Sequence, residues 1–230
     1  MSFDYCGPKS PLGEKINCIT LTKDFFEKHN INSVKDNLTR NFLSFRGVPI
    51  QYMNQVHGKN YEFISSRALT PSENVDALFC TKSNLALAAL SADCLPIALS
   101  KSDGSEFSVI HAGWKGLATG VIESSLSVFA NSNENLNAWI GPSISKDNYE
   151  VGEDLFDAFV KKDKSSLASF IKKDSNKWLF DLRGEAERIL RRFKIKVQTC
   201  DVCTYESKSL YSYRKHKTNK RLVTIIWRSI

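Results

Sequence analysis

Short apolar runs separated by polar turns predict that much of this chain is β-structure. Four runs follow one another before the middle of the chain, at residues 76–80, 85–91, 95–100 and 106–112. Short apolar runs bounded by turn residues are typical of strands. The Asp103-Gly104 pair between the last two runs is a strong signal for a hairpin. We therefore expect the chain to turn back so that Cys94 and His111 lie close together.

Further strands and helices are predicted on both sides of this hairpin. We expect strands at residues 48–56, 61–65, 194–203 and 221–227, and one that begins at residue 137 and ends at Gly141-Pro142. The turn "HGKN" joins the first two, which places His57 at a strand end. We expect a loop at 132–137 and helices at 116–130, 152–162 and 181–193, the last with Asp181 as its N-cap. Strands with helices between and after them predict an α/β fold of the mixed α+β kind.

The composition is that of an ordinary globular protein. The chain has 230 residues, of which 42% are hydrophobic and 25% are charged, so it can bury a core and lies outside the disordered class. This length favours a single domain over residues 1–230. The longest apolar run, at 85–90, falls short of the roughly 20 residues that span a membrane. The start of the chain does not read as a secretion signal, so we expect a cytoplasmic protein.

The formal charge of +7 is concentrated in the runs 161–164, 191–196 and 214–221. Such runs attract nucleic acid or an anionic small molecule. No nucleic-acid motif accompanies them, so solvated surfaces are the favoured interpretation. We therefore expect neither a nucleic-acid partner nor a membrane.

The histidines and one cysteine offer a metal site. His29 and His216 lie in charged segments and are expected to be solvated, whereas His57 and His111 each lie at a strand end beside a glycine, with Cys94 between them in sequence. Two imidazoles and a thiolate suit zinc and leave a fourth position for water or substrate. The spacings match no recognised short metal motif, so separately packed histidines and a buried free thiol remain the alternative.

The remaining cysteines and two aspartates carry weaker signals. Six cysteines are too few for a disulfide scaffold at this length. Cys200 and Cys203 form a C-x-x-C without a second pair, so buried thiols are the favoured interpretation. Asp93 lies next to Cys94 and is a candidate to orient a ligand or transfer protons, with a hydrogen-bonded turn residue as the alternative. Asp76 is a second candidate of the same kind.

Eight short motifs, read together, resemble the YfiH-like, laccase-domain family. In order they are "NQVHG" (54–58), "VDALFC" (75–80), "ADCLPI" (92–97), "HAGWKG" (111–116), "GPSISKDNYEVG" (141–152), "FDL" (180–182), "CTY" (203–205) and "YSYRK" (211–215). Members of this family are described as purine nucleoside phosphorylases with adenosine deaminase activity, formerly as polyphenol oxidases, and in some bacteria as peptidoglycan editing factors. The family fold is a mixed α/β arrangement with layered sheets flanked by helices.

The resemblance implies a zinc ion on His57, Cys94 and His111, the same three residues that ligand chemistry selects. It implies a zinc-dependent phosphorylase that acts on adenosine, inosine or methylthioadenosine with phosphate, and that also deaminates adenosine. Zinc lowers the pKa of bound water to about 7, which suits deamination. Asp93 is the first candidate for proton transfer.

Four residues are weaker candidates for substrate binding. Lys115, Arg214 and Lys215 are candidate anion contacts, and Tyr213 is a candidate stacking surface. Lys115 and Lys215 stand where the family commonly has arginine, and lysine keeps the charge without the two-pronged geometry of a guanidinium. The Gly- and Asn-rich opening of the family is not visible in residues 1–46, which we expect to be diverged.

Three other functions remain as alternatives. Cys94 as nucleophile, with His57 or His111 as its base, would give an amidase that edits peptidoglycan precursors. The same ligand set with Met53 nearby resembles a copper site, but a polyphenol oxidase needs several coppers, so zinc is favoured over copper. A non-enzymatic protein that binds nucleic acid or a partner through its basic C-terminal run would show steeply salt-dependent binding.

Overall fold

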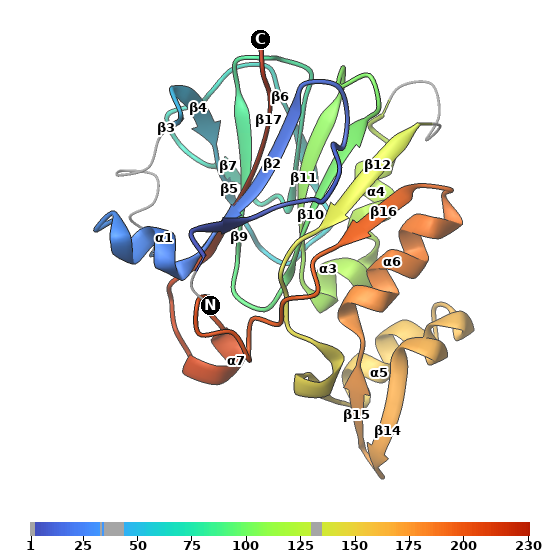
Figure 1. Cartoon of the computed structure of the whole chain (residues 1–230). Helices are drawn as coiled ribbons and strands as arrows, with labels where there is room; N and C mark the ends of the chain where they lie inside the picture. The colour runs from blue at the N-terminus through green and yellow to red at the C-terminus, as the bar shows by residue number, and fades with distance from the viewer. Residues whose placement is uncertain (1–2, 33, 35–43, 130–134) are drawn as a thin grey trace.

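Two six-stranded sheets form the centre of the molecule (Figure 1). The computed structural model describes residues 3–32, 34, 44–129 and 135–230. The first sheet contains, in spatial order, β1 (Tyr5–Cys6), β2 (Ile16–Leu21), β17 (Leu222–Arg228), β9 (Ala86–Ser91), β4 (Val48–Gln51) and β3 (Ser44–Phe45). The second contains β16 (Lys196–Thr199), β12 (Leu136–Ile140), β10 (Leu95–Lys101), β11 (Phe107–Ala112), β8 (Ala77–Cys80) and β6 (Tyr61–Ile64). The predicted mixed α/β fold is confirmed.

Smaller elements surround the two sheets. Two minor sheets consist of β13 (Glu150–Gly152), β15 (Lys177–Phe180) and β14 (Phe170–Asp174), and of β5 (Met53–Asn54) and β7 (Ser72–Glu73). The α-helices are α1 (Lys23–Lys28), α3 (Trp114–Thr119), α4 (Val121–Leu126), α5 (Glu153–Val160), α6 (Leu182–Arg192) and α7 (Tyr213–His216). Among the described residues, the 3₁₀ helices are η1 (Lys146–Asn148) and η2 (Lys164–Ser169). No helix in the described ranges is both long and apolar enough to cross a membrane.

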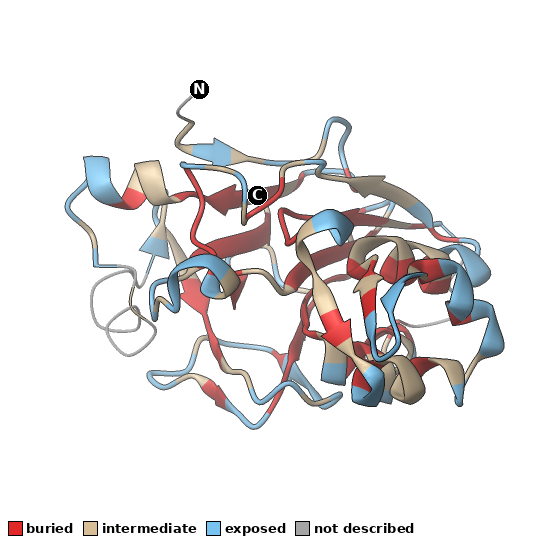
Figure 2. Cartoon of the chain, turned by 90° about the horizontal axis from the view of Figure 1, so that it is seen from below, coloured by how far each residue is buried: buried red, intermediate tan, exposed pale blue. Residues whose placement is uncertain are grey.

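The apolar runs of the sequence are strands that are buried on both faces. In β10, Leu95, Ile97 and Leu99 face the helical layer of α3, α4 and α6, whereas Ala98 faces the first sheet. In β9, Leu87 faces the second sheet. Ala86 and Ala88, on either side of it, face the opposite way and belong to an apolar cluster that includes Phe26 of α1. Because successive side chains of a strand point to opposite faces, each run supplies two layers of core. Figure 2 shows these strands as the buried centre of the molecule.

The predicted hairpin is confirmed, with Pro96 opposite His111 in the β10–β11 register. The predicted strands at 48–56 and 61–65 do not pair with each other, since β4 joins β9 and β6 joins β8. The helix expected over 116–130 is interrupted at Gly120, whose φ of 99° ends α3 and begins α4. A residue with that backbone angle cannot continue a right-handed helix.

The other helix predictions agree with the structure. The helix expected over 181–193 forms as α6, and the side chain of Asp181 accepts a hydrogen bond from the Gly184 amide as its N-cap. The helix expected over 152–162 forms as α5. Of the loop expected at 132–137, residues 132–134 lie outside the described part, and β12 has begun by Leu136.

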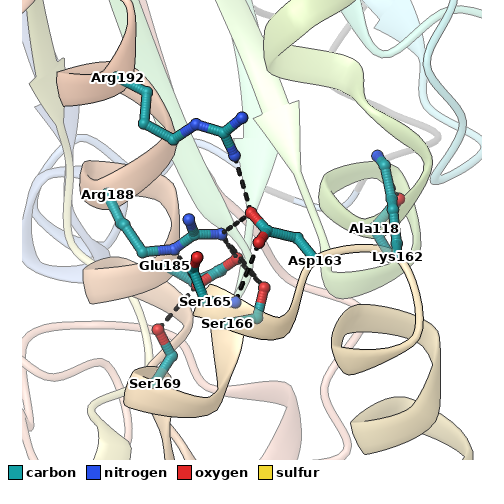
Figure 3. A network of polar contacts seen from close by, with 9 residues as sticks. All are labelled: Ala118, Lys162, Asp163, Ser165, Ser166, Ser169, Glu185, Arg188 and Arg192. Atoms are coloured by element: carbon teal, nitrogen blue, oxygen red, sulfur yellow. Dashed lines mark hydrogen bonds and ion pairs between the residues drawn. The ribbon is translucent and has the colours of Figure 1, made fainter.

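A buried carboxylate ties α6 to η2 (Figure 3). The side chain of Glu185 is 1% exposed and accepts hydrogen bonds of 2.8 Å from both Ser166 and Ser169. Arg188 donates to the same carboxylate at 2.7 and 3.0 Å and also lies 3.0 Å from Asp163. Burial would raise the pKa of Glu185, but Arg188 and the two serines outweigh it and lower the pKa.

We expect Glu185→Gln to lower the free energy of unfolding by about 2 kcal/mol at pH 7, because Arg188 keeps Asp163 as a partner but loses charged hydrogen bonds to the buried carboxylate. Since the pKa of Glu185 is lowered by folding, its contribution is present above the unfolded pKa of about 4.3 and is lost as the pH falls through the folded value. Urea unfolding at pH 7 and at several acidic pH values measures both effects. The control is Glu187→Gln, whose partner Arg191 is exposed; an equal loss in the control would contradict the prediction.

Candidate metal centre and substrate cavity

The structure brings the three predicted metal ligands together. The ligand atoms of His57, Cys94 and His111 all lie within 4.8 Å of one another. The Sγ atom of Cys94 is 3.8 Å from Nε2 of His57, and the two imidazole rings meet edge to face with centroids 4.8 Å apart. In the described part of the chain this is the only cluster of at least three His, Cys, Asp or Glu side chains that could hold a metal ion.

Local backbone structure places each of these side chains. His111 lies near the end of β11 on the face that also carries Phe107 and Val109. Cys94 immediately precedes β10, so the hairpin register brings it to the same end of the sheet. His57 has a φ of 60°, in the left-handed region, and this bend follows β5. His57 therefore comes from a loop, Cys94 from the start of a strand and His111 from the end of one.

Asp76 holds two of the ligands in position. Its carboxylate accepts hydrogen bonds from the amides of Val56 (3.1 Å), His57 (3.0 Å) and Gly58 (2.7 Å). It is also 2.8 Å from Nδ1 of His111. A carboxylate on Nδ1 fixes the imidazole tautomer and leaves Nε2 available to a metal. The aspartate with the weaker sequence signal is thus the one that orients the site.

The electrostatics of the cluster favour an ionised thiol. Burial would raise the pKa of Cys94, but His111 and His57 outweigh it and lower the pKa to about 6. Burial would likewise lower the pKa of His111, but Cys94 and Asp76 raise it to about 9. The pKa of Asp76 is lowered because His111 and the backbone amides overcome its burial. A thiolate is the form of cysteine that binds metals and acts as a nucleophile.

The start of α3 packs directly on the cluster because of its glycines. A Cβ atom on Gly113 would lie 2.6 Å from Cδ2 of His57 and 3.2 Å from Sγ of Cys94. A Cβ atom on Gly116 would lie 2.7 Å from the Gly58 carbonyl oxygen. These glycines allow helix backbone to approach where any side chain would displace a ligand.

The cluster opens into a cavity of about 590 Å³. Besides the ligands, its wall includes Tyr149, Tyr213, Arg214, Lys217 and Arg221. A volume of this size is typical of pockets that enclose a small organic ligand. Three cationic side chains and two aromatic rings give the wall the chemistry to hold an anion and a flat ring.

The predicted substrate-binding residues divide into two groups. Tyr213 and Arg214 line the cavity. Lys115 does not line it, and its Nζ atom lies 5.6 Å from the centre of the Trp114 ring. Lys215 does not line it either, and it donates to the Tyr205 carbonyl at 3.0 Å.

Sequence reasoning missed Lys217 and Arg221 as cavity residues. Both lie in the basic run 214–221, which was interpreted as a solvated surface. The signal that was available is the overlap of this run with the "YSYRK" motif. Tyr149 was also missed; its ring lies beneath the Arg214 guanidinium, 5.0 Å from centroid to Cζ, and burial raises its pKa.

Asp93 lines the cavity beside Cys94, and each of its carboxylate oxygens accepts a hydrogen bond. One carboxylate oxygen accepts a hydrogen bond of 2.6 Å from Oγ1 of Thr204, and the other accepts one of 2.6 Å from the Arg214 amide. Its φ is 94°, a backbone angle that costs energy and persists where the surroundings enforce it. Asp93 thereby fastens the first turn of α7 to the loop that carries Cys94.

The remaining histidines and the C-x-x-C cysteines lie outside the cluster. His29 and His216 are exposed, as predicted. Cys203 is buried and accepts a hydrogen bond from the Ser145 amide, which agrees with a structural thiol. Cys200 is half-buried.

Comparison with known proteins gives consistent matches along the chain. A family model described as multi-copper polyphenol oxidoreductase laccase matches residues 13–229. Purine nucleoside phosphorylase YfiH of Escherichia coli (strain K12) is 34% identical over 202 residues, which cover 86% of this chain and 82% of that protein. A purine nucleoside phosphorylase of Xylella fastidiosa (strain Temecula1) is 33% identical over 193 residues, covering 80% and 74%. The family match begins well before the first motif, so residues 13–46 fall within it.

Solved structures share the same architecture. A Neisseria meningitidis protein of the family DUF152 is 26% identical, with a TM-score of 0.86 over 99% of this chain and 100% of that chain. YlmD from Geobacillus stearothermophilus has a TM-score of 0.81 at 18% identity, over 100% and 98% of the two chains, and shows the common fold. With the family model and the curated relatives in agreement, the chain belongs to the laccase-domain family of YfiH-like proteins.

Proposed function

We propose that this protein is a zinc-dependent purine nucleoside phosphorylase that acts on adenosine, inosine or methylthioadenosine and that also deaminates adenosine. The observation that carries the proposal is the His57, Cys94 and His111 cluster in a cavity that cationic and aromatic side chains also line. The names of the relatives, which are purine nucleoside phosphorylases, support the substrate class.

The donor set suits zinc. Two imidazole nitrogens and one thiolate sulfur are ligands that zinc prefers, and three protein ligands leave a position for water or substrate. Asp76 on His111 is the kind of carboxylate partner that histidine ligands of zinc have. Copper accepts the same donors, but polyphenol oxidation with four-electron reduction of oxygen needs several coppers, and the described residues form one such cluster.

Bound zinc would supply a Lewis acid and a water whose pKa is lowered to about 7. In phosphorolysis a phosphate oxygen attacks C1′ of the ribose, and the bond to the purine nitrogen breaks. Arg214, Lys217 and Arg221 are the phosphate contacts, since cationic donors neutralise and orient the attacking anion. Arg214 is held for this task by the Tyr149 ring and by its bond of 2.9 Å to the Glu150 carbonyl. The ring of Tyr213 is the proposed stacking surface for the purine.

The first experiment measures metal content by elemental analysis on protein purified without added metal, and assays adenosine with and without phosphate. We expect about one zinc per chain, adenine and ribose 1-phosphate formed only with phosphate, and inosine formed in either condition. Removal of the metal by a chelator should abolish both products, and zinc should restore them. Copper together with oxygen-dependent oxidation of phenols would contradict the proposal, as would full activity without metal.

The second candidate function is an amidase with Cys94 as nucleophile. Its support is the lowered pKa of Cys94, about 6, beside two imidazoles. Alkylation separates the two functions. A metal-free protein that cleaves peptidoglycan precursors and is inactivated by iodoacetamide on Cys94 would favour the amidase, whereas protection of Cys94 by zinc would favour the phosphorylase.

Asp93 has a positioning role in this proposal, because both of its carboxylate oxygens are occupied. An asparagine retains both contacts: its oxygen accepts from the Arg214 amide and its NH₂ donates to Oγ1 of Thr204. We expect Asp93→Asn to keep kcat within about threefold, and Asp93→Ala to raise KM about tenfold because the start of α7 is released. Steady-state kinetics at several pH values measures both. If Asp93 instead transferred the proton, asparagine would lower kcat by about 10²-fold or more.

A further inference from the structure

The edges of the two large sheets meet near the N-terminus. β1 is the edge strand of the first sheet, and β16 is the edge strand of the second. The Ser10 amide donates to Oε1 of Gln198 at 2.9 Å, and Nε2 of Gln198 donates to the Ser10 carbonyl at 2.9 Å. This reciprocal pair fastens the segment that follows β1 against β16. Residues that are nearly two hundred positions apart in sequence therefore lie side by side.

Two thiols meet at this junction. Cys6 is the last residue of β1, and Cys200 directly follows β16, where its amide bonds the Ile140 carbonyl at 2.8 Å. The ends of β1 and β16 thus bring Cys6 and Cys200 to one junction, where each thiol acts on the pKa of the other. Both side chains pack on the core between the sheets, yet both are only half-buried. Cys18, on the neighbouring strand β2, is close by and is buried.

The surroundings of Cys200 favour its thiolate. The hydrogen bond from Cys6 lowers the pKa of Cys200 against the effect of burial, and the Val202 amide and the Arg183 guanidinium act in the same direction. The pKa of Cys6 is raised because it donates that hydrogen bond. A half-exposed thiolate near a cation, in contact with a second thiol, is the arrangement of a cysteine that oxidises and is then resolved by its neighbour.

The other cysteines have different partners. Cys80 accepts a hydrogen bond from the Lys82 amide at 3.2 Å, and Cys203 accepts one from the Ser145 amide at 3.3 Å. Cys94 belongs to the ligand cluster. The contact between Cys6 and Cys200 therefore distinguishes this pair from the remaining thiols, with Cys18 as the nearest competitor.

We propose that Cys6 and Cys200 form an oxidisable dithiol, which a peroxide converts into a disulfide that links the edges of the two sheets. The Cys200 sulfur attacks a peroxide oxygen, the O–O bond breaks, and Cys200 becomes a sulfenic acid as the other oxygen leaves as water. The Cys6 sulfur then attacks the Cys200 sulfur, and the sulfenic oxygen leaves as a second water with the thiol proton of Cys6. Two thiols and one hydrogen peroxide thus give one disulfide and two waters.

Peptide mapping tests the pairing. Zinc-loaded protein is treated with equimolar hydrogen peroxide and digested with trypsin without reduction. The fragments 1–9 and 197–208 contain Cys6 and Cys200, and fragment ions that break between Cys200 and Cys203 assign the second sulfur. We expect the cross-linked pair in the wild type and in Cys18→Ser, and none in Cys6→Ser. A bond from Cys6 to Cys18, a bond between Cys200 and Cys203, or oxidation confined to Cys94 would overturn the proposal.

Thermal unfolding gives an independent readout. A disulfide that joins positions 6 and 200 constrains a very long loop of the unfolded chain. We expect oxidation to raise the Tm of the wild type by about 5 °C or more, and dithiothreitol to reverse the rise. The Tm of Cys6→Ser should not respond to mild oxidation. A wild-type Tm that is unchanged or lowered by oxidation would show that the bond does not join the two folded edges.

Discussion

Replacement of Cys94 by alanine is expected to lower kcat/KM for nucleoside phosphorolysis by about a thousandfold and to remove the bound metal. The variant deletes the one thiolate of the cluster and leaves two imidazoles that lie in a cavity open to water. A catalytic metal supplies several kcal/mol of transition-state stabilisation, and roughly 4 kcal/mol corresponds to a factor of about 10³. Elemental analysis and steady-state assays on the same preparation measure both losses.

The control for this variant is Cys200→Ala, a half-buried cysteine that does not line the cavity. It should retain its zinc and wild-type activity. Circular dichroism should show that Cys94→Ala remains folded, since Cys94 lies at the surface of the cavity and not within an apolar core. A Cys94→Ala protein that keeps both zinc and activity would refute the proposed centre.

Replacement of Asp76 by asparagine is expected to weaken zinc binding by about 10- to 100-fold and to lower the free energy of unfolding by about 3 kcal/mol. All four groups that face this carboxylate are donors: the amides of Val56, His57 and Gly58, and Nδ1 of His111. An asparagine has one acceptor oxygen in place of two, so its NH₂ group would face at least one of the backbone N–H donors. The loop that carries His57 would lose hydrogen bonds to the carboxylate, and the tautomer of His111 would no longer be fixed.

Competition with a chromophoric zinc chelator measures the affinity, and urea unfolding of the metal-free protein measures the stability. Glu62→Gln, which neutralises an exposed carboxylate on the edge strand β6, serves as the control. If Asp76→Asn bound zinc as tightly as the wild type, the orienting role of Asp76 would be wrong.

The sequence predicted the part of the site that depends on local structure. The Asp103-Gly104 turn fixed the β10–β11 register, so Cys94 and His111 were expected to meet, and they do. His57 was placed at a strand end by its glycine-containing turn, but no local signal pairs that loop with the hairpin. Its position depends on three hydrogen bonds to Asp76, a tertiary contact that the motif alone does not reveal.

The cavity wall was the part that local reasoning missed. The sequence around Lys217 and Arg221 indicates a solvated basic run, whereas both residues line the cavity. Charge in a sequence does not indicate which side chains face a cavity. Lys115 and Lys215 were chosen by their positions in motifs, yet each lies on an aromatic ring outside the cavity. Strand order was likewise not predictable, because the central apolar runs in β8, β9, β10 and β11 are buried on both faces and none indicates its neighbours.

The position of β17 imposes an order on the making of this protein. β17 lies between β2 and β9 in the first sheet. During synthesis β2, which ends at Leu21, is therefore made long before its partner, which begins at Leu222. Ribosomes add about 5–20 residues per second, so this interval lasts about 10–40 s. Throughout it the facing edges of β2 and β9 have unpaired backbone groups, which attract other chains. The first sheet therefore cannot close until β17 has been synthesised.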